Sequence, residues 1–323
     1  MIVDFFNSIP AAVLSELGKL DLNIQIENAN PNINRLLSRT VLFGGKRLRP
    51  MLTYLMSDFF NVDYSRSQLL ARSVEQVHAA SLSHDDVVDN ATLRRGRPSI
   101  NNEASNKLAV LSGDYLLADV IVALSKRGNI TLVNEMSRVI MDLAEGEWLQ
   151  IEASEKRNYS REIIATIADK KTASVMSWCT QSPAIEGGFP DYVIKNAYQF
   201  GRHLGLAFQL KDDVIDFSGE SKKDHLSDLE NGLVNSVLFE WLELNREAKE
   251  RYLRGENLRD LWATTHIAEA LNSVDKQAQN HLSLAKKILD TLAAEVAHLH
   301  GQNIEDKLRP LKFVVDFIGN RRF

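Results

Sequence analysis

The chain has 323 residues, of which 38 are Lys or Arg and 43 are Asp or Glu, so its net charge is −5. A protein with this acidic balance is not expected to bind nucleic acid over a broad surface, because long-range attraction to phosphate requires net positive charge. The one cysteine, Cys179, cannot form a disulfide within the chain, which predicts a reducing, cytoplasmic location.

The spacing of proline predicts an all-α protein. Only seven prolines occur, and none lies between Pro98 and Pro183 or between Pro190 and Pro310. These long stretches are rich in Ala, Leu, Glu and Lys, which favour helices over strands. No linker or repeat divides the chain, so we expect a single domain over residues 1–323. The chemical motifs fall within about 42–230, and C-terminal helices are expected over 231–323.

The first conspicuous segment along the chain is the basic run Gly44-Gly45-Lys46-Arg47-Leu48-Arg49-Pro50, and a second follows at Arg94-Arg95-Gly96-Arg97-Pro98. Arg binds phosphate oxygens through two parallel hydrogen bonds, and Lys binds them as a point charge. Two such runs inside an acidic chain indicate a pocket for a small polyanion.

The first of two acidic clusters, Asp85-Asp86-Val87-Val88-Asp89, lies between the basic runs. Leu70, Val74 and Val77 keep helical spacing before it, so a helix is expected to lead into the cluster. On a helix the first and last carboxylates of this pattern lie on one face, one turn apart.

A polar loop is expected over Asn90–Asn106, and the most apolar run of the chain, Leu108–Leu124, follows it. Asp114 and Asp119 interrupt this run, which is too short to cross a bilayer. The N-terminal sequence lacks the basic start and long apolar core of a signal peptide. We therefore expect a soluble protein.

The second acidic cluster, Asp212-Asp213-Val214-Ile215-Asp216, repeats the spacing of the first and precedes a charged loop at Ser218–Gly232. Carboxylates crowded beside Val and Ile are unfavourable unless a cation lies between them. Mg²⁺ suits this position, because it binds a few carboxylates and completes its shell with water and phosphate oxygens. Two clusters on facing helices would hold one diphosphate through shared Mg²⁺, and either following loop could close over it.

A single acidic cluster could instead be a solvated helix face or a Ca²⁺ loop. The alternating ligands, central Gly and closing Glu of an EF-hand are absent. Two copies with equal spacing, both embedded in apolar sequence, are poorly explained as solvated surface.

Together these segments resemble the trans-polyprenyl diphosphate synthases, and they are most like the long-chain octaprenyl diphosphate synthases. The resemblance runs from about Leu42 to Glu230. It rests on His78 and on GGKRLRP at 44–50, HDDVVD at 84–89, LRRGRP at 93–98, SGDYLLAD at 112–119, AEGEWLQ at 144–150, KTA at 171–173 and FQLKDDVID at 208–216. It implies a large helical bundle of the isoprenoid synthase type with a central active-site cavity, and a homodimer.

The reaction implied by this resemblance joins isopentenyl diphosphate head to tail, in trans, to an allylic diphosphate. The allylic diphosphate ionises, the isopentenyl double bond attacks the allylic cation, and a proton is lost. Two or three Mg²⁺ ions and fixed cations would stabilise the departing diphosphate. Asp85, Asp89 and Asp212 are expected to bind Mg²⁺, and Asp86 and Asp216 to assist, partly through water.

The motif positions also imply substrate ligands. Those expected for the allylic diphosphate are Arg94, Lys171 and Lys223, and those for isopentenyl diphosphate are Lys46, Arg49, His78 and Arg95. Thr172 and Gln209 would place polar side chains near the developing cation. The residues expected to act in catalysis itself are Asp85, Asp89, Arg94, Lys171 and Asp212.

One segment departs from the family pattern. Asp228-Leu229 fits it, but Gly232-Leu233-Val234-Asn235 stands where the family has a Lys and a Thr. A phosphate-binding cation is therefore missing near Leu233. This puts the catalytic rate in question more than the reaction type, because both acidic clusters are intact.

Small residues one turn before Asp85 predict a long product, since short-chain members of the family carry a bulky aromatic there. The expected wall of the product tunnel consists of Val74, Val77, Ala80 and Ser81, with Tyr115 or Leu111 from a neighbouring helix. From Asp85 back to Val74 this wall is about 16 Å long, enough for several isoprene units, and we expect a product of about six to eight units. Such a product would serve quinone side chains and pass to membrane enzymes. Alternatively, Ala80 and Ser81 merely permit close helix packing.

Other functions remain as alternatives. A farnesyl or geranylgeranyl diphosphate synthase would share the motifs. A terpene cyclase would lack the GGKRLRP segment, and a weakly active partner subunit of a heteromeric synthase would be expected to lose its Asp clusters. Finally, Glu75-x-x-His78 and Glu295-x-x-His298 have the spacing of a carboxylate-bridged di-iron bundle, although chance matches of this kind are common.

Overall fold

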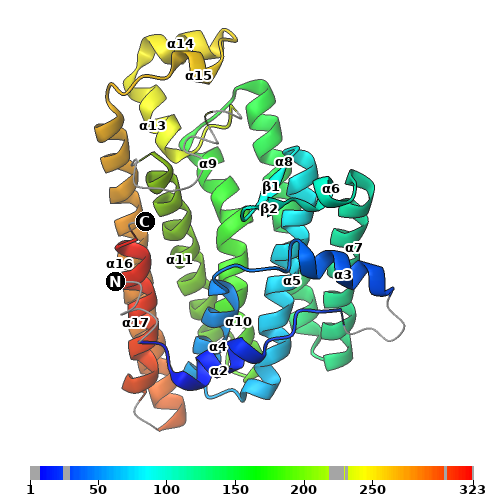
Figure 1. Ribbon diagram of the computed structural model, residues 1–323. Coiled ribbons are helices and arrows are strands. Elements are labelled where there is room, and N and C mark those ends of the chain that lie inside the picture. The colour runs from blue at the N-terminus through cyan, green and yellow to red at the C-terminus, as the bar shows by residue number, and fades with distance from the viewer. Residues whose placement is uncertain (1–7, 25–29, 218–228, 230–231, 302–303, 322–323) are drawn as a thin grey trace.

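The computed structural model describes residues 8–24, 30–217, 229, 232–301 and 304–321. Helices account for almost all of them (Figure 1), which confirms the expected all-α class. The N-terminal half contains α2 (Ala11–Lys19), α3 (Pro31–Arg39), α4 (Leu48–Phe59), α5 (Tyr64–Val88), α6 (Ile100–Glu103), α7 (Asn106–Arg127) and α8 (Ile130–Lys156). The C-terminal half contains α9 (Arg161–Ala168), the π-helix η1 (Asp169–Ala173), α10 (Ser174–Glu186), α11 (Asp191–Phe217), α13 (Ser236–Leu244), α14 (Arg246–Leu253), α15 (Leu258–Leu261), α16 (Ile267–His300) and α17 (Glu305–Gly319).

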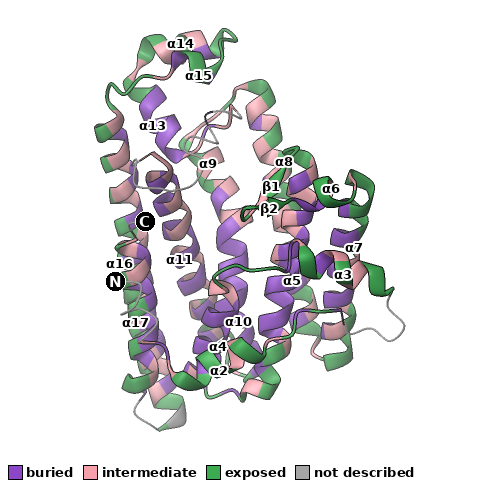
Figure 2. Cartoon of the chain, in the orientation of Figure 1, coloured by how far each residue is buried: buried purple, intermediate pink, exposed green. Residues whose placement is uncertain are grey.

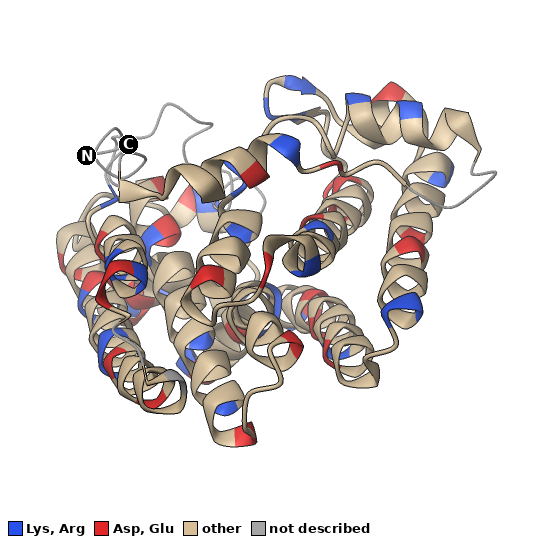
Figure 3. Ribbon diagram, turned by 90° about the horizontal axis from the view of Figure 1, so that it is seen from below, with Lys and Arg blue, Asp and Glu red and all other residues tan. Residues whose placement is uncertain are grey.

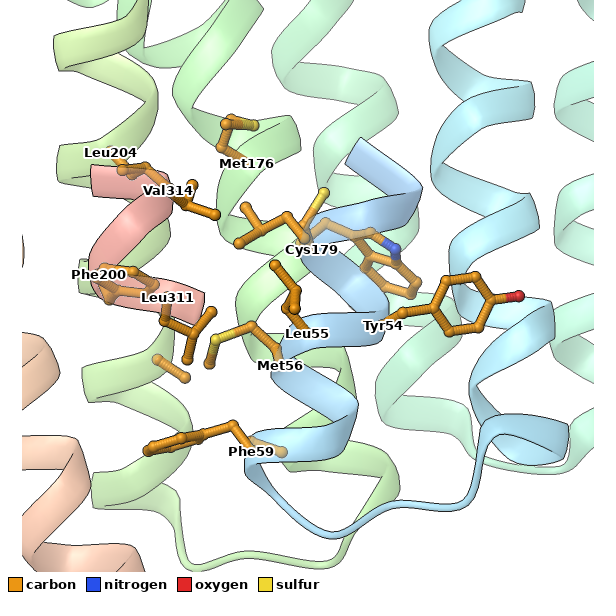
Figure 4. Close-up of a cluster of buried hydrophobic side chains, with 14 of the residues drawn as sticks. Tyr54, Leu55, Met56, Phe59, Met176, Cys179, Phe200, Leu204, Leu311 and Val314 are labelled. Carbon is orange, nitrogen blue, oxygen red and sulfur yellow. The ribbon is translucent and has the colours of Figure 1, made fainter. Parts of the chain in front are cut away.

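Helix α10 forms the centre of the bundle. All 13 of its residues are buried, and it packs on α4, α5, α8 and α11 (Figure 2). Side chains from α4, α10, α11 and α17 converge in the core beside it (Figure 4). Helix α11 approaches closely because Gly205 has no side chain: a Cβ there would lie 2.6 Å from the Cα of Ala173. The core therefore supports the helices that carry the acidic clusters.

Helices α5 and α11 carry the two clusters near their C-terminal ends, and both ends lie in the upper half of Figure 1. Helix α5 begins at an N-cap, where the side chain of Asp63 accepts a hydrogen bond from the Ser65 N–H. With 25 residues it is about 37 Å long. Two long helices thus present acidic ends to the same region.

The C-terminal helices lie against these elements. Helix α16 packs along α11, and α17 returns to pack on α16, α4 and α11. The chain leaves α17 with Arg321 directed toward α11. Acidic and basic residues are interspersed along the helices rather than separated into opposite halves (Figure 3).

The segment expected to be a polar loop, Asn90–Asn106, is more ordered than predicted. It contains a hairpin of β1 (Leu93–Arg94) and β2 (Arg97–Pro98), in which Arg94 pairs with Arg97, and then the short helix α6. The basic run thus forms the hairpin itself, because Gly96 supplies the positive φ that its turn needs. Most of the second expected loop, Ser218–Gly232, lies outside the described residues.

Helix α7 is the one helix of the described chain that is long and apolar enough to cross a membrane by length and composition. The expectation that this segment is too short is therefore wrong on length alone, since the helix continues beyond the apolar run Leu108–Leu124 to Arg127. Helices of soluble proteins can meet the same criterion. Only 39% of the apolar window is buried inside the chain, so much of this helix presents apolar surface.

Candidate active site

The first cluster combines two carboxylates with a neighbouring acid on α8. Loss of solvation raises the pKa of Asp85 to about 6; Lys171 and Arg94 oppose this rise, and the negative charges of Glu147 and Asp89 add to it. The pKa of Asp89 is also raised, first by burial and then by Glu147. Three acids crowded in this way favour a bound cation or a proton.

Asp86, the middle carboxylate of the cluster, has a different environment. It is completely buried, and its Oδ1 accepts hydrogen bonds from Arg94 Nε at 2.8 Å and Nη2 at 2.5 Å. Its Oδ2 accepts a longer one, 3.4 Å, from the N–H of Ile100 at the start of α6. Asp86 therefore holds the basic hairpin and α6 against α5. Its bonds to Arg94 also keep that side chain beside the first cluster.

Lys171 is positioned by the π-helix η1. Gly146 of α8 lets η1 lie close, since a Cβ there would come within 2.7 Å of Lys171 Cγ. The Lys171 ammonium pairs with Glu147 and lies 3.1 Å from Gln150 Oε1. A π-helix widens one turn of an otherwise α-helical segment, and such turns are frequent at functional sites. Here it directs Lys171 toward the first cluster and Thr172 toward α11.

A chain of hydrogen bonds links η1 to the second cluster. The Thr172 hydroxyl donates to Gln209 Oε1 at 2.7 Å, and Gln209 Nε2 donates to Asp213 Oδ1 at 2.9 Å. The other oxygen of Asp213 accepts the N–H of Ser236, the first residue of α13, at 3.0 Å. The two acidic clusters are thus connected through neighbouring residues of η1, although they are more than one hundred residues apart in sequence.

Asp212 has a partner that the sequence analysis did not identify. Arg321 Nη2 lies 2.6 Å from Asp212 Oδ1, and its guanidinium stacks over the ring of Phe208 at 4.2 Å. Arg321 lies far outside the motif-bearing core, and no local pattern marks it. Asp216, one turn beyond Asp212, is half-buried.

The residues expected to hold the second diphosphate surround a neutral histidine. The pKa of His78 is held well below its usual value, first by burial and then by the positive charges of nearby arginines, namely Arg49, Arg95, Arg94 and Arg47. Arg49 Nε is buried and has no hydrogen-bond partner in the part of the chain that the structure describes. Several guanidinium groups around one uncharged imidazole, with an orphaned donor among them, fit an anionic ligand.

The glycines of the first basic run make room for these arginines. Arg95 Nη1 donates to the Phe43 carbonyl at 2.7 Å, and its guanidinium lies so close to Gly45 that a Cβ there would be 3.0 Å away. Gly45 also has a φ of +84°, which side-chain-bearing residues rarely adopt. Lys46 is exposed on the same turn.

Arg47, in the same run, is a structural anchor that was not predicted. It donates to Glu75 Oε1 and to the Leu42 carbonyl, each at 2.5 Å. Glu75 is thereby occupied, and Glu295 accepts hydrogen bonds from Asn196. Among the described residues no three His, Cys, Asp or Glu side chains form a metal-binding group, so the di-iron alternative gains no support.

The segment that departs from the family pattern, Gly232-Leu233-Val234-Asn235, ends at the start of helix α13. Asn235 is the N-cap of α13, and its side chain accepts the N–H of Leu238 at 3.0 Å. Asn in place of the family's Thr therefore begins the helix equally well. Leu233 is half-buried before it, and Lys223 lies outside the described residues.

The expected tunnel wall divides between two parts of the core. Val74 and Val77 are fully buried in the large central cluster, whereas Ala80 packs with Ala109 and Leu116 of α7. The Ser81 hydroxyl donates to the His78 carbonyl at 2.9 Å. Leu111, proposed as a deeper wall residue, is 61% exposed, so that assignment is wrong. Tyr115 is partly buried beside the Ala80 cluster.

Magnesium fits this donor set. Mg²⁺ usually takes one or two carboxylates and obtains its remaining ligands from water and substrate phosphates, so a preformed cage of three acids is not required. The half-buried Asp85, with the like charges of Asp89 and Glu147 beside it, supplies hard oxygen ligands whose mutual repulsion a divalent cation would relieve.

Sequence comparison finds known proteins that are similar to this chain. The pattern described as polyprenyl synthetase matches residues 30–274. The mitochondrial solanesyl-diphosphate synthase 1 of Oryza sativa subsp. japonica is 34% identical, over 77% of this chain and 63% of that protein. Component 2 of the heptaprenyl diphosphate synthase of Geobacillus stearothermophilus is 37% identical, over 56% of each. The chain thus spans less than two thirds of the length of these two relatives. A prenyl transferase of Synechocystis is 33% identical, and the match covers 80% of it.

Solved structures agree with the sequence comparison. A decaprenyl diphosphate synthase from Rhodobacter capsulatus superposes with a TM-score of 0.79 at 26% identity, covering 100% of this chain and 97% of that one. A polyprenyl synthase from Caulobacter crescentus, complexed with calcium and isoprenyl diphosphate, superposes with a TM-score of 0.78 at 27% identity, covering 99% and 98%.

Proposed function

The chain belongs to the polyprenyl synthetase family, and we propose that it is a Mg²⁺-dependent enzyme that joins isopentenyl diphosphate to an allylic diphosphate to form a long-chain polyprenyl diphosphate. The observation that carries this proposal is the approach of both acidic clusters to η1, the first beside Lys171 and the second through Thr172 and Gln209, together with the arginines around His78. One region would hold an ionising diphosphate, and the other would hold the diphosphate of the acceptor.

In the first region, Asp85, Asp89 and Asp212 would hold the metal ions. When bound, Mg²⁺ would neutralise the charge that develops on the departing diphosphate. Lys171 would add a fixed positive charge on the same side once it exchanges Glu147 for a phosphate oxygen. The oxygen dipoles of Thr172 and Gln209 lie between the clusters, where a short-lived allylic cation would form.

In the second region, Arg49 and Arg95 would bind the isopentenyl diphosphate by paired hydrogen bonds, and Lys46 would add a point charge. His78 is uncharged, so it would contribute a hydrogen bond and not a charge. The rigid turn at Gly45 fixes Arg95 and thereby limits the entropy lost on binding.

A long-chain product is supported by the names of the relatives, which include solanesyl and decaprenyl diphosphate synthases. Small Ala80 on α5 is consistent with this product, although it packs against α7. We propose quinone side chains as the destination of the product, which would then pass to membrane enzymes. The alternative is a farnesyl or geranylgeranyl product. Measuring the length of the product decides between the two.

We also propose a homodimer that forms through α7 and α8. Of the 18 large hydrophobic side chains exposed in the described chain, eight belong to these two adjacent helices: Leu108, Val110, Leu111, Val122, Ile130, Met141, Trp148 and Ile151. Trp148 is 75% exposed, which is unusual for so large an apolar group. A second copy of the chain would cover this surface, and Leu111 would then be buried at the interface.

Two experiments test these proposals. Purified protein is incubated with labelled isopentenyl diphosphate, a short allylic diphosphate and Mg²⁺, and the products are separated by length. Long polyprenyl diphosphates are expected, and no incorporation by the protein alone would reject the activity.

Light scattering should show a dimer that Trp148→Glu dissociates, with Tyr192→Glu as an exposed control on α11. A monomeric wild-type protein would instead favour a partner subunit of a heteromeric synthase.

A further inference from the structure

A second basic site lies at the opposite end of the bundle from the acidic clusters. Helix α5 begins there, α8 begins there, and α10 ends there, in the lower part of Figure 1. Arg66, near the start of α5, precedes Asp85 by 19 residues of continuous helix, which corresponds to about 28 Å. A ligand bound at this end would not contact the proposed active site.

The charges at this end do not balance. The carboxylate of Glu186 is 3% exposed, and its Oε1 accepts Arg66 Nε at 2.9 Å, Arg127 Nε at 3.1 Å and Arg127 Nη2. Arg66 Nη2 donates to the backbone carbonyl of Glu186 at 2.6 Å. Two guanidinium groups therefore share one carboxylate and leave a net charge of about +1. The Nη1 group of each arginine has no hydrogen bond to any described residue, so donors remain for a second anion.

A cavity of about 480 Å³ opens beside this pair of arginines. It is lined by Arg66, Arg127, Gly128, Asn129, Ile130 and Glu186. Helix α8 begins here at Ile130, but α7 ends at Arg127 and α10 ends at Glu186, so the opposite helix ends offset one another and the positive charge of the site comes from the arginines. The cavity is large enough for a phosphate or carboxylate group and the first part of the molecule that carries it.

A second cavity of about 280 Å³ shares Arg66 with the first, and its lining is about half polar and half apolar. Its apolar residues are Phe60, Val62, Phe189, Pro190 and Leu299. The rings of Phe60 and Phe189 lie 4.8 Å apart, and Gly187 leaves no room for a side chain, because a Cβ would be 2.9 Å from Phe189. A cationic cavity and a partly apolar cavity thus adjoin at one arginine.

We propose that these two cavities together bind an anionic amphiphile, with its phosphate or carboxylate head between Arg66 and Arg127 and its apolar chain along Phe189, Pro190 and Leu299. Neither cavity is explained by the reaction proposed above, and the proposal does not depend on that reaction. An ionic head recruits the ligand through the unused guanidinium donors, and the apolar chain adds burial that a free anion cannot provide.

The test measures binding of octyl phosphate to the full chain by titration calorimetry without Mg²⁺. Octanoate, inorganic phosphate and octyl glucoside serve as comparisons. Octyl phosphate or octanoate should bind at least tenfold more tightly than inorganic phosphate and octyl glucoside, and the stronger of the two identifies the head group. Binding should persist in the presence of saturating inorganic diphosphate with Mg²⁺, which would occupy the active site.

Matched variants make the test specific to this end of the molecule. Arg127→Gln should weaken binding at least fivefold, and Leu299→Ser should remove most of the advantage of the alkyl chain. Glu186→Gln should tighten binding at least threefold, because it removes the competing negative charge and keeps a hydrogen-bond acceptor. Arg251 forms an exposed ion pair with Glu256 elsewhere on the surface. Arg251→Gln removes the same charge there and should leave the binding affinity unchanged. Equal binding by wild type, Arg127→Gln and Glu186→Gln, or equal binding of octyl phosphate and inorganic phosphate, would overturn the proposal.

Discussion

Asp86 and Asp213 are the second residues of the two acidic clusters, and they do the same structural work on different helices. Each is buried, and each accepts the N–H of the residue that begins the next helix of the described chain, Ile100 for Asp86 and Ser236 for Asp213. Each also receives a side-chain donor, from Arg94 or Gln209. The carboxylates of the repeated motif therefore have two roles. The middle one accepts a hydrogen bond from the start of a later helix, and the outer ones are the expected ligands of the metal.

This division gives a first prediction, about catalysis. Asp85→Asn and Asp212→Asn should each lower the rate of condensation by about 10²–10³, equivalent to about 2.7–4 kcal/mol, because each removes charge opposite the departing diphosphate. Circular dichroism should show the wild-type helix content. Rates close to wild type in both variants at saturating Mg²⁺ would mean that the outer carboxylates do not hold the metal.

A second prediction concerns stability. Asp86→Ala and Asp213→Ala should each lower the free energy of unfolding by about 1–3 kcal/mol, because each leaves buried donors without a partner. Urea denaturation measures the change. Asp89→Ala, in the same cluster but at the exposed end of α5, is the matched control and should lower the free energy of unfolding by no more than about 0.5 kcal/mol. Equal losses in all three variants would contradict the assigned difference between middle and outer residues.

The acidic clusters and their helices could be predicted because the spacing of one turn is a local property of the sequence. The distinction between Asp85 and Asp86 could not, because adjacent carboxylates look alike until the fold decides which one is buried. Glu147 and Arg321 were missed because each reaches the site from a distant part of the chain: Glu147 belongs to a quoted motif but was given no role, and Arg321 follows α17, where no motif marks it. Leu111 was misplaced because an apolar stripe does not show whether it faces the core or the surface.

The raised pKa of Asp85 leads to a third prediction. Its pKa rises on folding from 3.8 to about 6, so the folded protein binds this proton more tightly than the unfolded chain. The contribution to stability is therefore complete below about pH 3.8 and is lost as the pH rises through about 6. Without Mg²⁺, the unfolding free energy of wild type minus that of Asp85→Asn should fall by at most roughly 3 kcal/mol between about pH 4 and pH 7. A difference that stays constant over this range would show that Asp85 titrates normally.

A fourth prediction concerns product length. Ala80→Phe should shorten the main product to about three or four isoprene units if Ala80 lines the upper tunnel, because a dense wall cannot relieve the added bulk. Ala79→Phe is the matched control: its neighbouring side chain, also buried, points about 100° away around the helix. It should cost a similar amount of stability without shortening the product. Unchanged products from Ala80→Phe would favour the alternative that Ala80 only allows α5 to pack against α7.

The π-helix η1 has a consequence for how the sequence can change. Residues 161–186 run through α9, η1 and α10 as one helical segment, so removing a single residue from η1 could restore a regular α-helix there. A π turn accommodates one extra residue, so such a deletion would leave α9 and α10 nearly in phase but would change the directions of the side chains within η1. Lys171 and Thr172 would then no longer face one cluster each. An insertion or deletion within these five positions should therefore be far less tolerated than a substitution, and the length of this segment is as much a part of the site as its side chains.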